Sequence, residues 1–106
     1  MRKSITFSTH VLDTSTGAPA PQVSVVLTPA GDGAPLSGRT DADGRLRFPE
    51  PFPSGEYELS FELAEHFGGR PHLSDRVRLH LRLEEPRHYH VPLLVSPFGF
   101  ASYRGS

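Results

Sequence analysis

Hydrophobic and polar residues alternate strictly along much of the chain. The alternation is clearest over 56–63, "EYELSFEL", and it recurs over 4–12 and over 76–83, while a β-branched run begins at Val23. A period of two places apolar side chains on one face of a strand and polar side chains on the other. These segments are therefore predicted to be β-strands with one buried face. The residues expected to point inward are Ile5, Phe7, Thr9, Val11, Tyr57, Leu59, Phe61, Leu63, Val77, Leu79, Leu81 and Leu83.

Eleven prolines and ten glycines interrupt the chain at short intervals. Turns are expected at 17–21, 31–35, 41–44 and 49–55. Asp43-Gly44 indicates a tight hairpin between "SGRT" and "RLRF". A single short helix is expected over 63–69, where glycines end the pattern. The prediction is an all-β fold, a sandwich of seven to eight short strands with one short helix, forming a single domain over 1–106.

The composition narrows the possible partners. Eleven Lys and Arg residues against twelve Asp and Glu give a net charge of -1, which argues against nucleic acid or an anionic membrane as the main partner. Cysteine is absent, so disulfides and thiolate chemistry are excluded. The start, "MRKSITFSTHV", lacks the apolar core of a secretory signal, and a cytoplasmic protein is expected. A chain of 106 residues can enclose only a shallow pocket, which favours a site shared between subunits.

Histidines form the first candidate site. His88 and His90 share one face of a predicted strand, with Tyr89 and Val91 on the other. Such a pair can bind a metal, but zinc needs further ligands, and no spacing motif supplies them. Histidines held by hydrogen bonds at a sheet surface are the ordinary alternative. His10, on the polar face of the first strand, suits proton transfer near neutral pH, although a single strand histidine is more often structural.

Arg45 follows the turn "TDADG" and begins a strand. It is either a solvated edge charge or a fixed donor for an anionic oxygen. A calcium loop around this turn is rejected, because its first ligand would be Arg39 and its flanks are strands rather than helices. The arginines within 76–83 are ascribed to a solvated sheet face. Ser106 with the histidines suggests nucleophilic chemistry, but no nucleophile-elbow motif surrounds it.

The chain ends on Tyr103, Arg104, Gly105 and Ser106, directly after an apolar segment. Disordered tails rarely have this composition. We therefore expect the tail to be held in place, with Tyr103 packed and hydrogen-bonded through its hydroxyl and Arg104 bound to a carbonyl or carboxylate. Gly105 would allow a close backbone approach, and Ser106 would bring its hydroxyl and the terminal carboxylate near the histidines.

Four motifs, in order and at matching spacing, resemble the 5-hydroxyisourate hydrolase branch of the transthyretin family. These are "STHVLDTSTGAPA", "TDADGR", "HYHVPLLVSP" and the terminal "YRGS". The resemblance covers essentially the whole chain. It departs from the family in the stretch "GRPHLSDRVRLHL" and at Phe100 and Ala101. It implies a transthyretin-like (prealbumin) sandwich assembled as a homotetramer, with sites in a channel where dimers meet.

The resemblance also implies an activity, namely hydrolysis of 5-hydroxyisourate to 2-oxo-4-hydroxy-4-carboxy-5-ureidoimidazoline in urate breakdown, with no metal or organic cofactor. His10 or His90 would act as the base, Arg45 would stabilise the oxyanion, and Ser106 would pass or position a proton. The alternatives are a non-catalytic transthyretin-like binding protein and a structural sandwich module. By motif, the implied site residues are His10, Arg45, His90, Tyr103, Arg104, Gly105 and Ser106.

Overall fold

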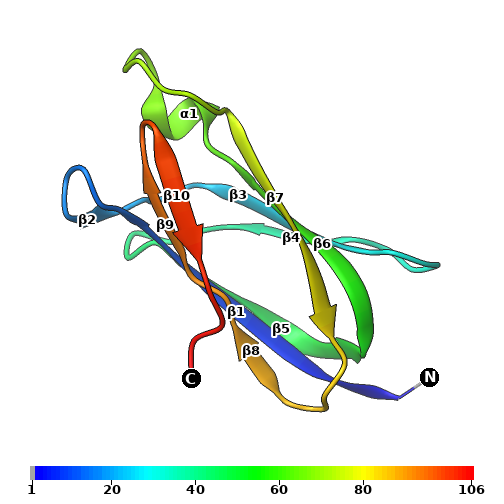
Figure 1. Cartoon of the computed structure of the whole chain (residues 1–106). Coiled ribbons are helices and arrows are strands. Elements are labelled where there is room, and N and C mark those ends of the chain that lie inside the picture. Colours follow the sequence, from blue (N-terminus) through cyan, green and yellow to red (C-terminus); the bar gives the residue numbers. More distant parts are fainter. Residues whose placement is uncertain (1) are drawn as a thin grey trace.

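Two β-sheets pack around one hydrophobic core in the computed structural model, which describes residues 2–106 (Figure 1). In chain order the elements are β1 (Lys3–Asp13), β2 (Ala18–Pro19), β3 (Ser24–Pro29), β4 (Leu36–Arg39), β5 (Arg45–Pro53), β6 (Gly55–Glu62), α1 (Ala64–Phe67), β7 (Arg76–Leu83), β8 (His88–His90), β9 (Leu93–Ser96) and β10 (Gly99–Ser102). The predicted sandwich with one short helix is confirmed. The count of seven to eight strands holds when two-residue β2 is set aside and β8 and β9 are taken as one interrupted strand.

β1 is the central strand of the first sheet. It pairs antiparallel with β5 and then β2 along one edge, and parallel with β8 and then β9 along the other. β10 pairs antiparallel with β9 and completes this sheet. The inward residues predicted for this strand, Ile5, Phe7, Thr9 and Val11, are all buried. The opposite face of β1 is therefore left for polar side chains.

The second sheet has the strand order β4-β3-β6-β7. Its alternation follows the sequence pattern, and the predicted inward residues of β6 are buried. In β7, Val77 and Leu83 are buried, whereas Leu79 and Leu81 are only partly buried. These two leucines line a cleft of about 290 Å³ that also receives part of the C-terminal tail.

Two turn predictions need correction. The turn at 41–44 forms, but β4 and β5 do not make a hairpin, because β4 pairs with β3 in one sheet and β5 with β1 in the other. The buried Thr40 hydroxyl donates to the carbonyl of Ala20 at 2.7 Å and accepts from the amide of Val23 at 2.9 Å. These bonds hold the end of β4 beside β3, so the following turn directs the chain into the opposite sheet.

The segment 49–55 was expected to be a turn, but β5 continues through it to Pro53. The pairing register with β1 shifts here, which marks a β-bulge. Pro49 and Pro51 lack the amide protons that an uninterrupted ladder requires. Phe48 and Phe52, on either side of the irregular stretch, are both buried. The prolines thus interrupt the hydrogen bonding, while the phenylalanines keep the strand on the core.

The helix α1 lies within the predicted range 63–69 and ends where the amide of Gly68 donates to the carbonyl of Ala64. Among residues 2–106, no helix has the length and apolar character needed to cross a membrane. The helix region is tied to β1 by the carboxylate of Asp13, whose side chain is 1% exposed. That carboxylate lies 2.8 Å from His66 Nε2 and accepts a bond of 3.0 Å from the Arg70 guanidinium.

Burial alone would raise the pKa of the Asp13 carboxyl, but hydrogen bonds from Ser15, Arg70 and His66 outweigh burial and hold this pKa well below its usual range. Removing the carboxylate would leave the partners of a buried ion cluster unpaired. Asp13 is thus the point at which β1, the turn after it and the helix region are fixed together.

We predict that Asp13→Ala lowers the free energy of unfolding by about 3 kcal/mol, and the melting temperature by about 10 °C or more. Because the folded-state pKa is depressed, this stabilisation is complete above about pH 5 and declines as the pH falls through the unfolded-state pKa of about 3.9 and below. Calorimetry over a pH series measures both effects. Asp32→Ala, on an exposed loop residue, is the matched control. Equal melting temperatures for the two variants would show that Asp13 does not stabilise the contact between β1 and the helix region.

Candidate functional site

The outward face of β1 carries Thr6, Ser8 and His10, and the neighbouring strands place further polar residues beside them. Ser8 lies opposite Arg47 of β5 on one side and His90 of β8 on the other. In the same register His10 pairs with Arg45, and Thr6 pairs with His88. The alternation of three adjacent strands therefore gathers these seven side chains on one sheet face.

A cavity of about 420 Å³ opens on this face. Its lining residues are Ser8, Thr9, His10, Asp41, Arg45, Leu46, Arg47 and His90. The structure thus brings together three of the predicted site residues, His10, Arg45 and His90. Imidazoles that exchange protons beside guanidinium groups that bind oxyanions are suited to the hydrolysis of a carbonyl compound.

The turn at 41–44 positions Arg45. The Asp41 carboxylate accepts hydrogen bonds from the amides of Asp43 at 2.9 Å and Arg45 at 3.0 Å. Gly44 has φ of +74°, and a Cβ there would lie 2.5 Å from the carbonyl oxygen of Val11. The Gly44 carbonyl also accepts from the Val11 amide at 2.8 Å. Only glycine fits this contact, which seats the turn against β1 and fixes where β5 begins.

Hydrogen bonds join the two β8 histidines to β1. Ser8 Oγ lies 2.9 Å from His88 Nε2 and 2.8 Å from His90 Nδ1. His88 Nδ1 lies 2.7 Å from Thr6 Oγ1. Thr6, Ser8 and Arg47 were not among the predicted site residues. The signal was present nonetheless, because the alternation had already placed Thr6 and Ser8 on the same face as His10.

Burial lowers the pKa of His90, and the positive charges of His10 and Arg45 lower it further. The pKa of His88 is lowered by burial and then by Arg47, His90 and Arg87. Both imidazoles are therefore neutral at pH 7, and a neutral imidazole can accept a proton. Within residues 2–106 no group of three or more His, Asp or Glu side chains is arranged to hold a metal ion, so the His88–His90 pair gains no further ligand.

Two hydrogen bonds hold the C-terminal tail within the single chain. Ser102 Oγ donates to the carbonyl of Pro92 at 2.8 Å, and the Gly105 amide donates to the carbonyl of His90 at 2.7 Å. A Cβ on Gly105 would lie 2.9 Å from His90 Cδ2, so the glycine packs directly against the imidazole. Tyr103 is 56% exposed in the single chain, and its expected role as an anchor, like that of Arg104, stays a prediction.

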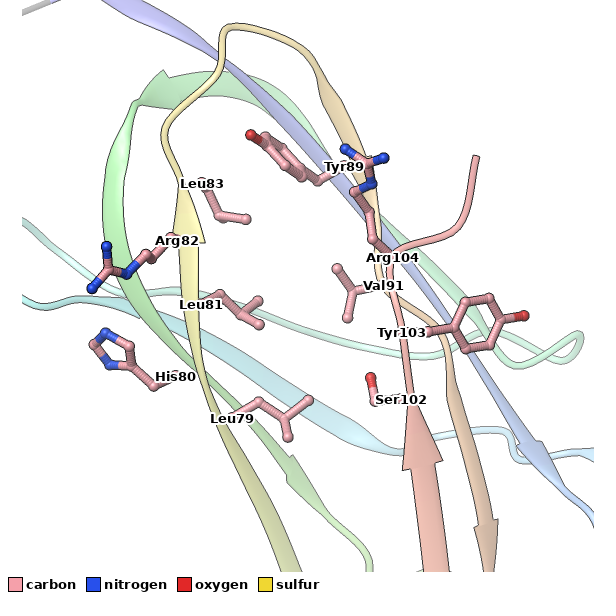
Figure 2. Close-up of a pocket in the computed structure, with 10 residues that line it drawn as sticks. All are labelled: Leu79, His80, Leu81, Arg82, Leu83, Tyr89, Val91, Ser102, Tyr103 and Arg104. Carbon is pink, nitrogen blue, oxygen red and sulfur yellow. The ribbon is translucent and has the colours of Figure 1, made fainter.

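Tyr103 and Arg104 do not line the cavity with the histidines. They line the apolar cleft of about 290 Å³ between the tail and β7 (Figure 2). Figure 2 shows Leu79, Leu81 and Leu83 of β7 directed across this cleft and the Tyr103 ring directed away from them. Ser106 is exposed and lines neither space. The strand β8 thus lies between the two spaces, with Tyr89 at the apolar cleft and His90 at the polar cavity, and Gly105 is the tail's contact with His90.

Three comparisons describe what the chain is similar to. The model of the HIUase/Transthyretin family matches residues 7–105. The 5-hydroxyisourate hydrolase of Mesorhizobium japonicum is 40% identical over 112 residues, covering 93% of this chain and 90% of that protein. The structure of Klebsiella pneumoniae 5-hydroxyisourate hydrolase superposes with a TM-score of 0.85 at 37% identity, covering 100% of this chain and 97% of the other. Transthyretin from Sparus aurata shares the fold, with a TM-score of 0.79 at 23% identity over 98% of this chain and 97% of the other.

We predict that His90 titrates below the usual histidine pKa of about 6.5 and that Arg45→Ala raises its pKa. Removing a neighbouring positive charge makes the imidazolium less unfavourable, while the effect of burial remains. Proton NMR of the imidazole resonances across a pH series measures both values. Arg39→Ala removes the same charge from the other sheet and is expected to leave the titration unchanged. An unaltered His90 pKa in Arg45→Ala would show that the two groups are not coupled.

Proposed function

Because the chain belongs to the HIUase/Transthyretin family, we propose that it hydrolyses 5-hydroxyisourate to 2-oxo-4-hydroxy-4-carboxy-5-ureidoimidazoline in urate breakdown. The observation that carries the proposal is the meeting of His10, Arg45 and His90 around one polar cavity. The matched hydrolases support the substrate. The likeness to a transthyretin, at 23% identity, supports the fold alone.

Hydrolysis of a cyclic amide requires a base, a stabilised oxyanion and a proton for the leaving nitrogen. In our proposal His90 takes a proton from water as the water oxygen attacks the carbonyl carbon. His90 is assigned as the base because burial, and then the charges of His10 and Arg45, lower its pKa, which keeps the imidazole neutral and able to accept a proton. The Arg45 guanidinium stabilises the negative charge that develops on the carbonyl oxygen. The carbon–nitrogen bond then breaks, and the nitrogen receives a proton from His10 or through Ser106.

A transthyretin-like binding protein is the rival function, since it would use the same sandwich without catalysis. Ultraviolet spectroscopy of freshly prepared 5-hydroxyisourate separates the two, because an enzyme accelerates its decay over the spontaneous rate. A rate equal to that without protein would exclude the hydrolase. We further propose that the chain works as a homotetramer, in which subunits enclose a cavity that one sheet face leaves open. A cytoplasmic location stays a prediction.

We predict that His10→Asn and Arg45→Ala each lower kcat by roughly two to three orders of magnitude, as expected for loss of a proton-transfer group or an oxyanion donor. Both side chains lie outside the hydrophobic core, so the free energy of unfolding is expected to change by less than about 0.5 kcal/mol. Steady-state kinetics with thermal melting measures the two effects. His80→Asn and Arg39→Ala are the matched controls. Near wild-type kcat in either site variant would remove that residue from the mechanism.

We also predict that deleting Gly105 and Ser106, or adding a C-terminal tag, cripples hydrolysis while an N-terminal tag does not. Gly105 contacts the base His90 directly, and Ser106 with its terminal carboxylate follows at once. Sedimentation is expected to give a tetramer for the wild type and for each altered form, which separates loss of the site from loss of assembly. Equal activity of the two tagged forms would show that the tail has no part in the site. An active monomer would contradict the shared cavity.

A further inference from the structure

Four side chains on the outward face of the first sheet form one unbroken row of hydrogen bonds. The row begins at Thr6 Oγ1, which lies 2.7 Å from His88 Nδ1, and continues from His88 Nε2 to Ser8 Oγ at 2.9 Å. It ends at His90 Nδ1, 2.8 Å from the same Ser8 oxygen. His88 uses both of its ring nitrogens in the row, and Ser8 Oγ takes part in two bonds. His90 Nε2 is left without a hydrogen-bond partner within residues 2–106.

The number of protons restricts how this row can be arranged. A hydroxyl carries one proton, and a neutral imidazole carries one proton on either of its two nitrogens. If His90 Nδ1 donates to Ser8 and the Ser8 hydroxyl also donates within the row, the Ser8 proton goes to His88 Nε2, and His88 Nδ1 then donates to Thr6. In the opposite arrangement every donor becomes an acceptor, and the proton of His90 lies on Nε2. The row therefore couples the tautomer of His90 to groups that lie as far away as Thr6.

The charges around His90 distinguish the two arrangements. Arg45 and His10 line the same cavity as His90, and Arg47 lies opposite Ser8 on β5. A guanidinium carries only donors, so it attracts a lone pair and repels an N–H group. The arrangement with a lone pair on His90 Nε2 is therefore the more favourable one. In this arrangement the row of hydrogen bonds ends at the Thr6 hydroxyl. The proton of that hydroxyl can point to solvent, because the bond between Thr6 and His88 is exposed.

We propose that Thr6, His88 and Ser8 are positioning residues that hold His90 in the Nδ1–H tautomer, with the Nε2 lone pair available to the cavity. This inference rests on the proposed function in one respect only, the use of His90 as the base. The hydrogen-bonded row selects the tautomer whether or not the chain hydrolyses 5-hydroxyisourate. Ser8 also lines the cavity, whereas Thr6 and His88 do not, so Thr6 offers the cleaner test of an effect transmitted through other residues.

Nitrogen-15 NMR of the imidazole rings reports the tautomer directly, at a pH where both histidines are neutral. We expect the Nδ1–H form of His90 in the wild type, and a mixture of both forms in Ser8→Ala and in Thr6→Val. The matched controls are Ser60→Ala on β6 and Thr28→Val on β3, which remove hydroxyls from half-buried strand positions of the other sheet. Ser8→Thr keeps a hydroxyl and is expected to restore the single tautomer. The intact backbone bond from the Val91 amide to the Ser8 carbonyl gives reason to expect that these variants fold.

Kinetics on the same variants gives a second measurement. We expect Ser8→Ala to lower kcat by about tenfold to a hundredfold, below the roughly 10²–10⁴ that a general base contributes in full, and Thr6→Val to lower it severalfold with little change in KM. An Nε2–H tautomer in the wild type, or a single unchanged tautomer in both Ser8→Ala and Thr6→Val, would overturn the proposal. If the wild type failed to hydrolyse the substrate while the NMR result held, the proposed function would fall and the tautomer assignment would stand.

Discussion

The hydrogen bonding of β1 is the constraint on which the rest of the structure depends. One strand of eleven residues forms ladders with β5, β2, β8 and β9, so both of its edges are paired along most of its length. Its inward face contributes Phe7 to the core, and its outward face contributes Ser8 and His10 to the polar cavity. A register slip of one residue would exchange the two faces. The packing that stabilises the core therefore also fixes the positions of the candidate site residues.

The interruption between β8 and β9 leaves the register with β1 unchanged, because Ser8 pairs with His90 before it and Val11 pairs with Leu93 after it. Pro92 cannot donate to a ladder, and the Val91 carbonyl turns toward the buried Thr9 hydroxyl, which donates to it at 2.6 Å. The strand β9 then continues along β1, and β10 folds back antiparallel to β9. This return path delivers Gly105 to His90. A residue at the end of the chain thus reaches the site through the pairing of β10 with β9, which runs from Ser96 back to Leu93, beside the break.

The sequence alone predicted the parts of the molecule that follow from local patterns. The alternation assigned the inward and outward faces of β1 and β6 correctly, and the glycine pair after α1 marked its end. It could not predict the crossing from β4 to β5, because that depends on Thr40 binding Ala20 and Val23, which are distant in sequence. The bonds that hold the tail within one chain were not predicted either, because Ser102 and the Gly105 amide bind the carbonyls of Pro92 and His90 through tertiary contacts. The bonds from Ser8 to His88 and His90 depend on parallel pairing of chain segments about eighty residues apart, which no local pattern specifies.

The cavity lies on an open sheet face, so water weakens the electrostatic interactions of the charged side chains that line it. The attraction between a guanidinium and a developing oxyanion is weak in water and grows as water is excluded. One chain already buries His90 enough to lower its pKa, but Arg45 stays exposed at the mouth of the cavity. Four large apolar side chains remain exposed in the single chain and do not line this cavity, namely Leu73, Phe98, Phe100 and Tyr103. Association through such surfaces lowers the free energy by removing apolar area from water. A tetramer in which two polar sheet faces meet would exclude water from the cavity and strengthen the electrostatics of a site that a single sandwich leaves open.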